Sequence, residues 1–241
     1  MVNLVIDRGN SALKTGVFDN NKLIVSESFR DNFSPITAYF KQFDIDNIII
    51  SSVVKNDDRT FKNMLESYVK KVLILDHETI LPFNNHYRTP QTLGKDRLAG
   101  VAGGQSLFPG ENLLIVDAGT AITYDLLLNG TEYQGGDIAP GLEMRLKALH
   151  HFTSRLPLVR KNQEITFPGK NTYEAISSGA YNGMIFEIEG YRSFCKEKYK
   201  SLTTILTGGD ADFLVKKLKK PIFADHNLVL KGLNRIMEYN A

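Results

Sequence analysis

Two short polar runs of the same kind carry the side chains best suited to chemistry in this sequence. Asp7-Arg8-Gly9-Asn10-Ser11 and Asp117-Ala118-Gly119-Thr120-Ala121 each follow an apolar stretch, and they lie about half the chain apart. An aspartate at the end of a buried strand can hold magnesium or another cation, and a glycine with positive φ lets backbone amides face a phosphate. The pair of runs therefore indicates a duplicated clamp for nucleotide phosphates.

The segments around each run predict the strands that would position it. Residues 2–6 and 113–116 are rich in β-branched residues and leucine, which is typical of buried strands. The alternating segments 12–18 and 122–128 follow as hairpin partners. Either run alone could be an ordinary Asp-Gly hairpin turn. Because the two occupy matching positions in halves of similar length, we favour an internal repeat.

The rest of the chain alternates between strand and helix patterns. Strands are predicted at 22–29, 48–50, 72–75 and 203–207, and helices at 34–43, 56–68, 98–107, 142–151, 171–191, after 210 and from 227. Residues 84–92 are predicted to form an ordered loop and residues 135–141 a turn-rich segment. The small residues of helix 98–107 would allow very close packing against a neighbour. We place a domain boundary near Pro109, giving domains 1–109 and 110–241.

Composition limits the class of protein without defining it. The 241 residues are 42% hydrophobic and 23% charged, with a formal net charge of +2. These values are typical of a soluble globular protein and indicate no polyanion-binding surface by themselves. The basic run 216–220 lacks interleaved aromatic residues, so we expect no nucleic-acid partner.

Cysteine usage and hydropathy predict a cytoplasmic protein with no membrane partner. Cys195 is the single cysteine, which excludes an intramolecular disulfide and a multi-cysteine metal site. No apolar run approaches the roughly twenty residues that cross a bilayer. The chain enters a strand at once, without a charged leader before an apolar region. Adjacent His150 and His151 would point to different helix faces, so they offer no metal centre.

Five motifs occur in the order found in type III pantothenate kinases, and the chain resembles that family over essentially its whole length. They are Asp-x-Gly-Asn-Ser-x-x-Lys at 7–14, Gly94-Lys95-Asp96-Arg97, Asp117-Ala118-Gly119-Thr120, Gly135-Gly136-x-Ile138-x-Pro140-Gly141 and Thr207-Gly208-Gly209-Asp210. Each motif alone is weak evidence for a family, whereas five motifs in this order are specific. The resemblance implies an α/β protein with the duplicated RNase H-like fold of the actin-like ATPases. That fold has two similar domains, each with a mixed central sheet flanked by helices.

This resemblance implies ATP-dependent phosphorylation of pantothenate to 4'-phosphopantothenate, the first step of coenzyme A biosynthesis. Phosphoryl transfer asks the protein mainly for positioning and charge neutralisation. Asp96 is implied as the general base that accepts the proton of the alcohol, although an aspartate there could instead be a helix N-cap. Asp7 would organise Mg²⁺, directly or through water.

The nucleotide is implied to contact both polar runs and the last glycine-rich motif. ATP and its phosphates are assigned to Asp7, Gly9, Asn10, Ser11, Lys14, Gly119, Thr120, Ala121, Gly208, Gly209 and Asp210. Asp117 resembles a residue that helps bind potassium or ammonium beside the phosphates, with a second magnesium ligand as the alternative. Asp210 could also cap the helix that follows it, which does not exclude a role at the nucleotide.

The family pattern also implies a pantothenate site. It is assigned to Tyr87, Gly94, Lys95, Asp96, Arg97 and Thr172. The planar guanidinium of Arg97 could bind the carboxylate or amide of pantothenate, or it could lie on the surface of a first helical turn. Tyr87 could instead be a packing residue. Thr172 is similar to a residue that reaches the partner's site, which implies a homodimer with its active site near the subunit interface, although it could simply cap a helix.

Departures from the pattern leave two other functions open. Arg8 replaces the usual aliphatic residue, Ser11 stands where threonine is commoner, and Ser154-Arg155 replaces small apolar residues. Serine keeps the hydroxyl, and we have no account of Arg8. Another small-molecule kinase or a phosphatase of the superfamily would share both runs without needing the 94–97 tetrad. A nucleotide-sensing regulator would need no base at Asp96.

Overall fold

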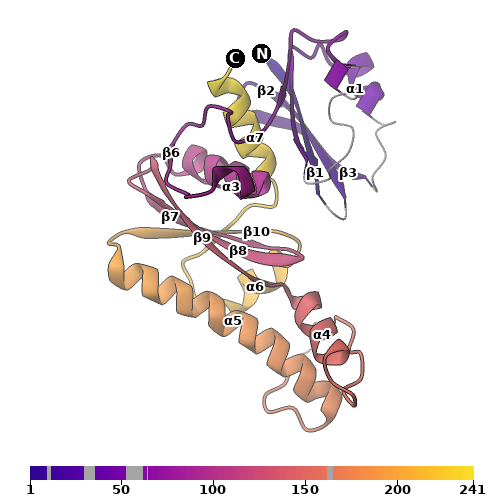
Figure 1. Cartoon of the computed structure of the whole chain (residues 1–241), viewed down its shortest axis with the longest axis vertical. Helices are drawn as coiled ribbons and strands as arrows, with labels where there is room; N and C mark the ends of the chain where they lie inside the picture. Colours follow the sequence, from indigo (N-terminus) through magenta and orange to yellow (C-terminus); the bar gives the residue numbers. More distant parts are fainter. Residues whose placement is uncertain (10–11, 30–35, 53–61, 64, 162–164) are drawn as a thin grey trace. The chain divides into compact units, whose positions relative to one another are not determined.

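The chain folds into two compact units (Figure 1). The computed structural model describes residues 1–9, 12–29, 36–52, 62–63, 65–161 and 165–241. Unit 1 comprises Met1–Gly110, Asn129–Gln134 and Asn227–Ala241, and unit 2 comprises Glu111–Leu128 and Gly135–His226. The predicted division into 1–109 and 110–241 therefore assigns the chain's last helix to the wrong unit, because that helix packs on the elements of unit 1.

The sheet of unit 1 is built around a buried central strand. Its strands are β1 (Val2–Arg8), β2 (Leu13–Asp19), β3 (Lys22–Phe29), β4 (Asn47–Ser52) and β5 (Lys71–Ile74), in the spatial order β3-β2-β1-β4-β5. β1 pairs antiparallel with β2 and parallel with β4, so the sheet is mixed. One hydrophobic cluster contains Leu4 and Ile6 of β1, Ile48 and Ile50 of β4, and apolar residues of α1 (Ile36–Gln42). This confirms the predicted strands of the first half.

Two helices of unit 1 approach each other as closely as their small residues allow. They are α3 (Lys95–Leu107) and α7 (Leu228–Tyr239), which lie side by side in Figure 1. A Cβ added to Gly232 would lie 1.7 Å from the Ala99 carbonyl oxygen, and one added to Gly103 would lie 2.2 Å from that of Leu228. The close packing predicted for the small residues of the 98–107 helix is thus confirmed.

A chain of buried amides fixes α7 to the sheet. Asn47 donates a hydrogen bond to Asn3 (Nδ2 to Oδ1, 3.0 Å), and Asn3 donates to Asn234 (2.8 Å). All three side chains are buried. Because a buried amide that loses its partner is costly, this chain favours a single docking position for α7.

The sheet of unit 2 repeats the order of the first. Its strands β7 (Asn112–Ala118), β8 (Ala121–Leu128), β9 (Glu132–Pro140), β10 (Leu202–Thr207) and β11 (Phe223–Ala224) are ordered β11-β10-β7-β8-β9, with β6 (Asn84–Asn85) beyond β9. β7 pairs antiparallel with β8 and parallel with β10. β7 thus takes the place that β1 has in the first sheet, which confirms the repeat.

Helices cover the second sheet. They are α4 (Leu142–His151), α5 (Thr172–Lys198) and α6 (Ala211–Lys217). The long helix α5 runs along the sheet in Figure 1, and its buried residues, such as Met184 and Ile188, share a cluster with Val116 and Leu206. These helices were predicted, although α5 extends to Lys198.

Two segments predicted as irregular contain regular structure. Residues 135–140 belong to strand β9, because pairing within the sheet outweighs the low strand propensity of glycine. The 84–92 loop contains β6 and a 3-10 turn, η1 (Pro90–Thr92). The predicted cap at 34–35 and the start of the predicted 56–68 helix lie outside the described residues, while Lys62, Asn63 and Leu65 are helical.

Candidate active site

The first polar run begins inside the sheet of unit 1. Asp7 lies near the end of β1, where it is opposite Lys14 of β2 and Ser51 of β4 in the strand registers. It is partly buried, and Lys14 is exposed. Asn10 and Ser11 lie outside the described residues. The parallel strands β1 and β4 end side by side, so their last polar residues share one edge of the sheet.

The carboxyl group of Asp7 is shielded from solvent and lies near a second acidic side chain. Burial, followed by the negative charge of Asp96, raises the pKa of Asp7 to about 6. The neighbouring Ser51 hydroxyl and the charge of Lys14 lower the pKa of Asp7 and so act in the opposite direction. The carboxylates of Asp7 and Asp96 are therefore within electrostatic reach of each other, although they are far apart in sequence. The structure brings together the two acids that the sequence assigned to chemistry.

Asp96 is positioned by the start of α3. The helix begins at Lys95 with Gly94 as its N-cap residue, three residues earlier than predicted. Asp96 Oδ1 accepts a hydrogen bond from the Arg97 backbone N–H (2.8 Å). A Cβ on Gly94 would lie 2.5 Å from that oxygen, so glycine leaves room for the carboxylate. The alternative that Asp96 is the N-cap is wrong, and its charge lies in the first turn, where the helix dipole favours it.

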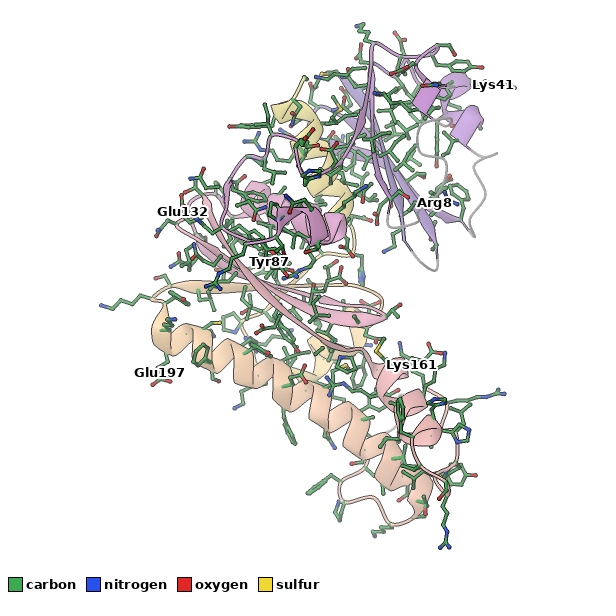
Figure 2. The ribbon with its side chains drawn as sticks, viewed as in Figure 1. Arg8, Lys41, Tyr87, Glu132, Lys161 and Glu197 are labelled. Atoms are coloured by element: carbon green, nitrogen blue, oxygen red, sulfur yellow. The ribbon has the colours of Figure 1, made fainter. Side chains whose placement is uncertain are left out.

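Arg97 and Tyr87 lie together in unit 1. The Arg97 guanidinium lies 5.6 Å from the centroid of the Tyr87 ring, a cation–π distance. Arg97 is buried, so the alternative of a surface arginine is wrong. Tyr87 is held by its backbone N–H, which donates to Asn85 Oδ1 (3.0 Å), and Figure 2 shows its side chain. Two residues assigned to pantothenate are therefore neighbours.

Backbone groups pack closely around the second polar run. Thr120 accepts a hydrogen bond from the Gly141 N–H (3.1 Å), and Ala118 accepts one from the Asp210 N–H (3.0 Å). A Cβ on Gly141 would lie 2.2 Å from the Gly119 carbonyl oxygen. A Cβ on Gly208 would lie 2.5 Å from Asp117 Oδ1. The motifs around 117, 141 and 208 thus converge in unit 2.

The positive φ expected of the glycines in the two runs is wrong. Neither Gly9 nor Gly119 has a positive φ, whereas Gly208 has φ +93°. Gly9 instead closes a tight turn in which its N–H donates to the Ala12 carbonyl oxygen (3.0 Å). Gly208, which follows β10, has the left-handed backbone conformation because the chain turns sharply against Ala118 there.

Asp210 makes an ion pair that the sequence did not indicate. It is the N-cap residue of α6, but its side chain makes no capping hydrogen bond and pairs with Lys161 (Figure 2 shows Lys161). Asp210 is buried and Lys161 is exposed. Nothing in the local sequence distinguishes Lys161 from the other basic residues near it, so only the fold could identify this pair.

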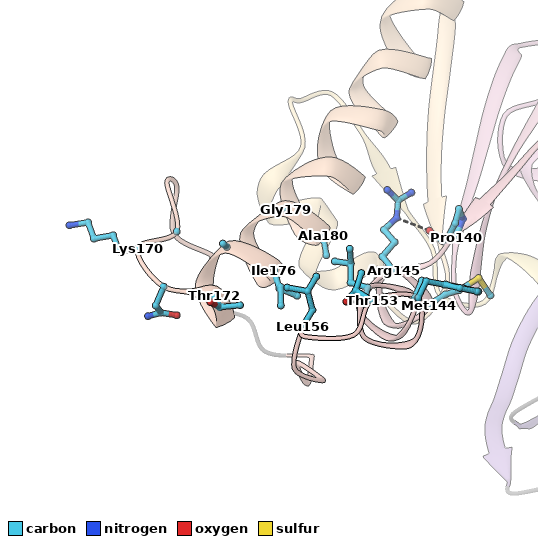
Figure 3. Close-up of a pocket in the computed structure, with 16 residues that line it drawn as sticks. Pro140, Met144, Arg145, Thr153, Leu156, Lys170, Thr172, Ile176, Gly179 and Ala180 are labelled. Carbon is cyan, nitrogen blue, oxygen red and sulfur yellow. Dashed lines mark hydrogen bonds between the residues drawn. The ribbon is translucent and has the colours of Figure 1, made fainter.

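Thr172 lies away from the second run, beside a groove. It is the first residue of α5, while Asn171 is the cap and accepts from the Glu174 N–H (3.0 Å). The alternative that Thr172 is the cap is therefore wrong. The groove between α4 and α5 has a volume of about 1200 Å³ (Figure 3). Its lining is mostly apolar and includes Met144, Ala148, Leu149, Phe152, Leu156 and Ile176.

Oxygen ligands for a hard cation are available in unit 1. Among the described residues no group of three or more His, Cys, Asp or Glu side chains could hold a metal. Asp7, Asp96 and the Ser51 hydroxyl offer oxygen donors of the kind that magnesium prefers. The negative charge of the two carboxylates fits a cation that is bound together with a nucleotide. In the part of the chain that the structure describes, no helix is long and apolar enough to span a membrane.

Solved structures with the same architecture define the fold class. A conserved protein from Campylobacter jejuni, described as a Baf family transcriptional activator, aligns over 98% of both chains with a TM-score of 0.65 at 24% identity. The ROK hexokinase of Thermus thermophilus aligns over 99% of this chain and 100% of its own, with a TM-score of 0.53 at 14% identity. At these identities the likeness concerns the fold alone, and that fold is the actin-like, duplicated RNase H-like one.

Fold and sequence together define a kinase with the actin-like fold. A sequence model of the type III pantothenate kinases matches residues 3–193. The type III pantothenate kinase of Christiangramia forsetii is 46% identical over 99% of this chain and 99% of its own. The chain belongs to the type III pantothenate kinase family.

Proposed function

We propose that this kinase transfers the γ-phosphoryl group of ATP in line to the primary hydroxyl of pantothenate, giving 4'-phosphopantothenate for coenzyme A biosynthesis, with Asp96 as general base. The observation that carries the assignment is the coupling of Asp96 to Asp7 in unit 1. One oxygen of Asp96 accepts the Arg97 N–H, which orients the carboxylate at the start of a rigid helix. A carboxylate within hydrogen-bond reach of the alcohol can accept its proton as the new phosphorus–oxygen bond forms.

Asp7 and Lys14 are assigned to the transferring phosphoryl group. Asp7 would hold Mg²⁺, directly or through water, and Lys14 would contact the phosphates with Gly9, Asn10 and Ser11. When bound with ATP, magnesium neutralises phosphate charge. The raised pKa of Asp7 supports this role, because a carboxylate that is costly to ionise alone gains most from a cation.

Pantothenate is assigned to the residues around the start of α3. Arg97, whose guanidinium lies over the Tyr87 ring, has a planar fork of donors that suits a carboxylate or an amide. Gly94 and Lys95 complete this part of the proposed site. The tetrad 94–97 is the feature that another kinase or phosphatase of the superfamily would not need, and a sensor without turnover would not need Asp96.

The second run is assigned to the nucleotide. Gly119, Thr120 and Ala121 would line the phosphates, and Gly208, Gly209 and Asp210 would support the adenosine. The supporting observation is the close backbone packing of this region, which leaves no room for a Cβ at Gly141 or Gly208. Asp117 would contribute to a site for a monovalent cation, potassium or ammonium.

A homodimer is proposed from the groove beside Thr172. Phe152 is 81% exposed and Met144 is 43% exposed on this face, and an apolar patch of this kind is typical of a protein–protein interface. Thr172 stands at its edge, where it could reach a partner's pantothenate site. The cytoplasmic location stays a prediction.

The reaction is tested by ADP release from magnesium-ATP with and without pantothenate in potassium buffer. We expect release to depend on pantothenate and the product to be 4'-phosphopantothenate by mass spectrometry. ADP release that ignores pantothenate but responds to another small alcohol would overturn the substrate. Nucleotide binding without any turnover would support the sensor instead.

The cation is tested in the same assay at equal ionic strength. Potassium and ammonium should give higher rates than sodium, and Asp117→Asn should abolish that difference. Equal rates in all three salts would contradict the cation site.

Sedimentation tests the dimer at assay concentration. The wild type should sediment as a dimer, and Phe152→Glu, at the end of α4, should weaken it, while Phe194→Glu, a matched change at an exposed phenylalanine of α5, should not. A fully active monomer would rule out a shared site.

A further inference from the structure

Arg145 is one of the polar residues that line the mostly apolar groove of unit 2, and Figure 3 shows its side chain reaching toward Pro140. Its Nε donates a hydrogen bond to the Pro140 carbonyl oxygen (2.8 Å). Its backbone N–H donates to the next carbonyl oxygen, that of Gly141 (3.0 Å). One residue on α4 therefore holds two consecutive carbonyl groups of the chain that enters the helix.

The same guanidinium is anchored on its other side. Arg145 Nη2 donates to Glu187 Oε2 on α5 (2.7 Å). The second oxygen of Glu187 accepts a hydrogen bond from the hydroxyl of Tyr124 on β8 (2.7 Å). Tyr124 is buried and its ring stacks on Tyr191, with centroids 4.0 Å apart. We call Arg145, Glu187 and Tyr124 the Arg145 network.

The carbonyls that Arg145 holds lead directly to the second polar run. Gly141 donates its N–H to the Thr120 carbonyl oxygen and packs so tightly that a Cβ would lie 2.4 Å from that atom. A shift of the Pro140–Gly141 backbone would therefore move Gly119 and Thr120. Close packing leaves no slack to absorb such a shift.

We propose that the Arg145 network positions the Gly119–Thr120 turn for the nucleotide, with Arg145 as a positioning residue that acts through Pro140 and Gly141. This rests on the proposed assignment of that turn to the phosphates of ATP. The network links α4, α5 and β8, so the turn is held by three elements of the same unit. Burial and the contact with Glu187 raise the pKa of Tyr124, so its hydroxyl remains a donor throughout the working pH range.

The test compares the network with an exposed ion pair on the same helix. Arg145→Met keeps an apolar stem in the groove and removes the guanidinium. Lys147→Met is the matched control, because Lys147 pairs with Glu143 (2.8 Å) and both side chains are about two-thirds exposed, at 65% and 66%. For each variant, kcat and both KM values are measured, with ADP affinity by calorimetry, thermal unfolding and sedimentation.

We expect Arg145→Met to lower kcat/KM for ATP by about 10- to 100-fold, because small misplacements of binding groups have effects of this size. ADP affinity should fall with it, and KM for pantothenate should stay unchanged. Arg145→Lys should restore part of the loss, since one ammonium cannot reproduce the planar fork. Glu187→Gln should act in the same direction, and the double variant should be no worse than Arg145→Met alone, as members of one network are non-additive.

Three outcomes would overturn the proposal. The first is an Arg145→Met variant with the ATP parameters of Lys147→Met. The second is an equal rise of both KM values, which would indicate a general structural role, and the third is an effect on pantothenate or dimer formation alone. Tyr124→Phe keeps the packing and should give a smaller loss of the same kind if Arg145→Met does not fold. ADP calorimetry still tests the inference if the wild type does not phosphorylate pantothenate, so the two failures are distinguishable.

Discussion

The two polar runs have equivalent places in the fold, and they are built in different ways. β1 and β7 are the central strands of two sheets with the same order, and each delivers an aspartate near its end. Around Asp7 the neighbours are charged or polar side chains: Asp96, Lys14 and Ser51. Around Asp117 the neighbours include glycines 141 and 208, whose backbones touch the turn. A duplicated unit has thus become a cluster of charges in one copy and a close-fitting backbone surface in the other.

This difference suggests that the two polar runs have different functions. A cluster of carboxylates can bind a cation and accept a proton, whereas a surface of backbone groups can approach a phosphate closely without adding charge. Changes in unit 1 should therefore act mainly on turnover, and changes in the second run mainly on nucleotide affinity. The predictions below test that separation.

Asp96→Asn should have the largest effect. The substitution keeps the shape of the side chain but removes the carboxylate that acts as base, so kcat should fall by roughly 10²–10⁴-fold. ADP affinity, measured by calorimetry, should remain within a few-fold of the wild type. Asp44→Asn, at an exposed position of the same unit, is the control. Near-normal turnover would remove the base assignment, and a parallel loss of ADP affinity would break the proposed division.

Gly208→Ala should act in the opposite way, with a loss of ADP affinity of about 10-fold or more. An alanine at φ +93° costs roughly 1–2 kcal/mol in backbone strain, and its Cβ would meet Asp117 and Ala118. Gly190→Ala, in α5, is the control, because a Cβ there would have no neighbouring atom within 4 Å. An unchanged ADP affinity in Gly208→Ala, or an equal loss in Gly190→Ala, would contradict the role given to the close packing around Asp117.

Sequence patterns predicted the repeat because buried strands and hairpins follow from local periodicity. The strands around Asp7 and Asp117 and the helix after Pro140 needed no long-range information. The assignment of α7 to unit 1 did need long-range information, because it depends on the fit of Gly232 against Ala99 and on the amides of Asn3 and Asn234. Strand β9 was missed because its glycines are poor strand formers and only pairing stabilises them there.

Local sequence patterns were limited in the same way at the candidate site. Asp7, Asp96 and Asp117 were indicated by motif, and their roles remain proposals. Their environments could not be predicted, because the raised pKa of Asp7 depends on burial and on a residue from a distant segment. Lys161 and the Arg145 network had no motif at all. The positive φ was assigned to the wrong glycines because the demand for it comes from the packing of Gly208 on Ala118.

Asp7→Asn should stabilise the protein while it abolishes most turnover. The folded-state pKa of about 6 is above the ordinary 3.8, so the folded protein retains a proton that the unfolded chain loses. The ionised group therefore costs stability above pH 6, on the order of 1–3 kcal/mol, and this cost is relieved as pH falls from 6 to 4. Denaturant unfolding without nucleotide and with chelator should show the variant more stable at pH 7.5, with the difference shrinking at pH 4.5.

Asp44→Asn, at an exposed position of the same unit, is measured in the same way as the control. An Asp7→Asn variant that is less stable than the wild type at pH 7.5 would contradict the cost assigned to the buried, ionised Asp7. Asp96→Asn should give part of the same gain, because it removes the second largest cause of the raised pKa.

The smallest expected effect concerns the alcohol substrate. Tyr87→Leu removes the aromatic ring next to Arg97 and with it a cation–π contact worth about 0.5–2 kcal/mol. KM for pantothenate should therefore increase by a factor between a few-fold and about 30-fold. Tyr87→Phe keeps the ring and should change KM less, and Tyr239→Leu, at an exposed tyrosine of α7, should leave it unchanged. KM for ATP should stay constant in all three. A rise in KM for ATP with Tyr87→Leu would mean that unit 1 carries nucleotide affinity as well as chemistry, and the contrast between the two runs would then be one of degree.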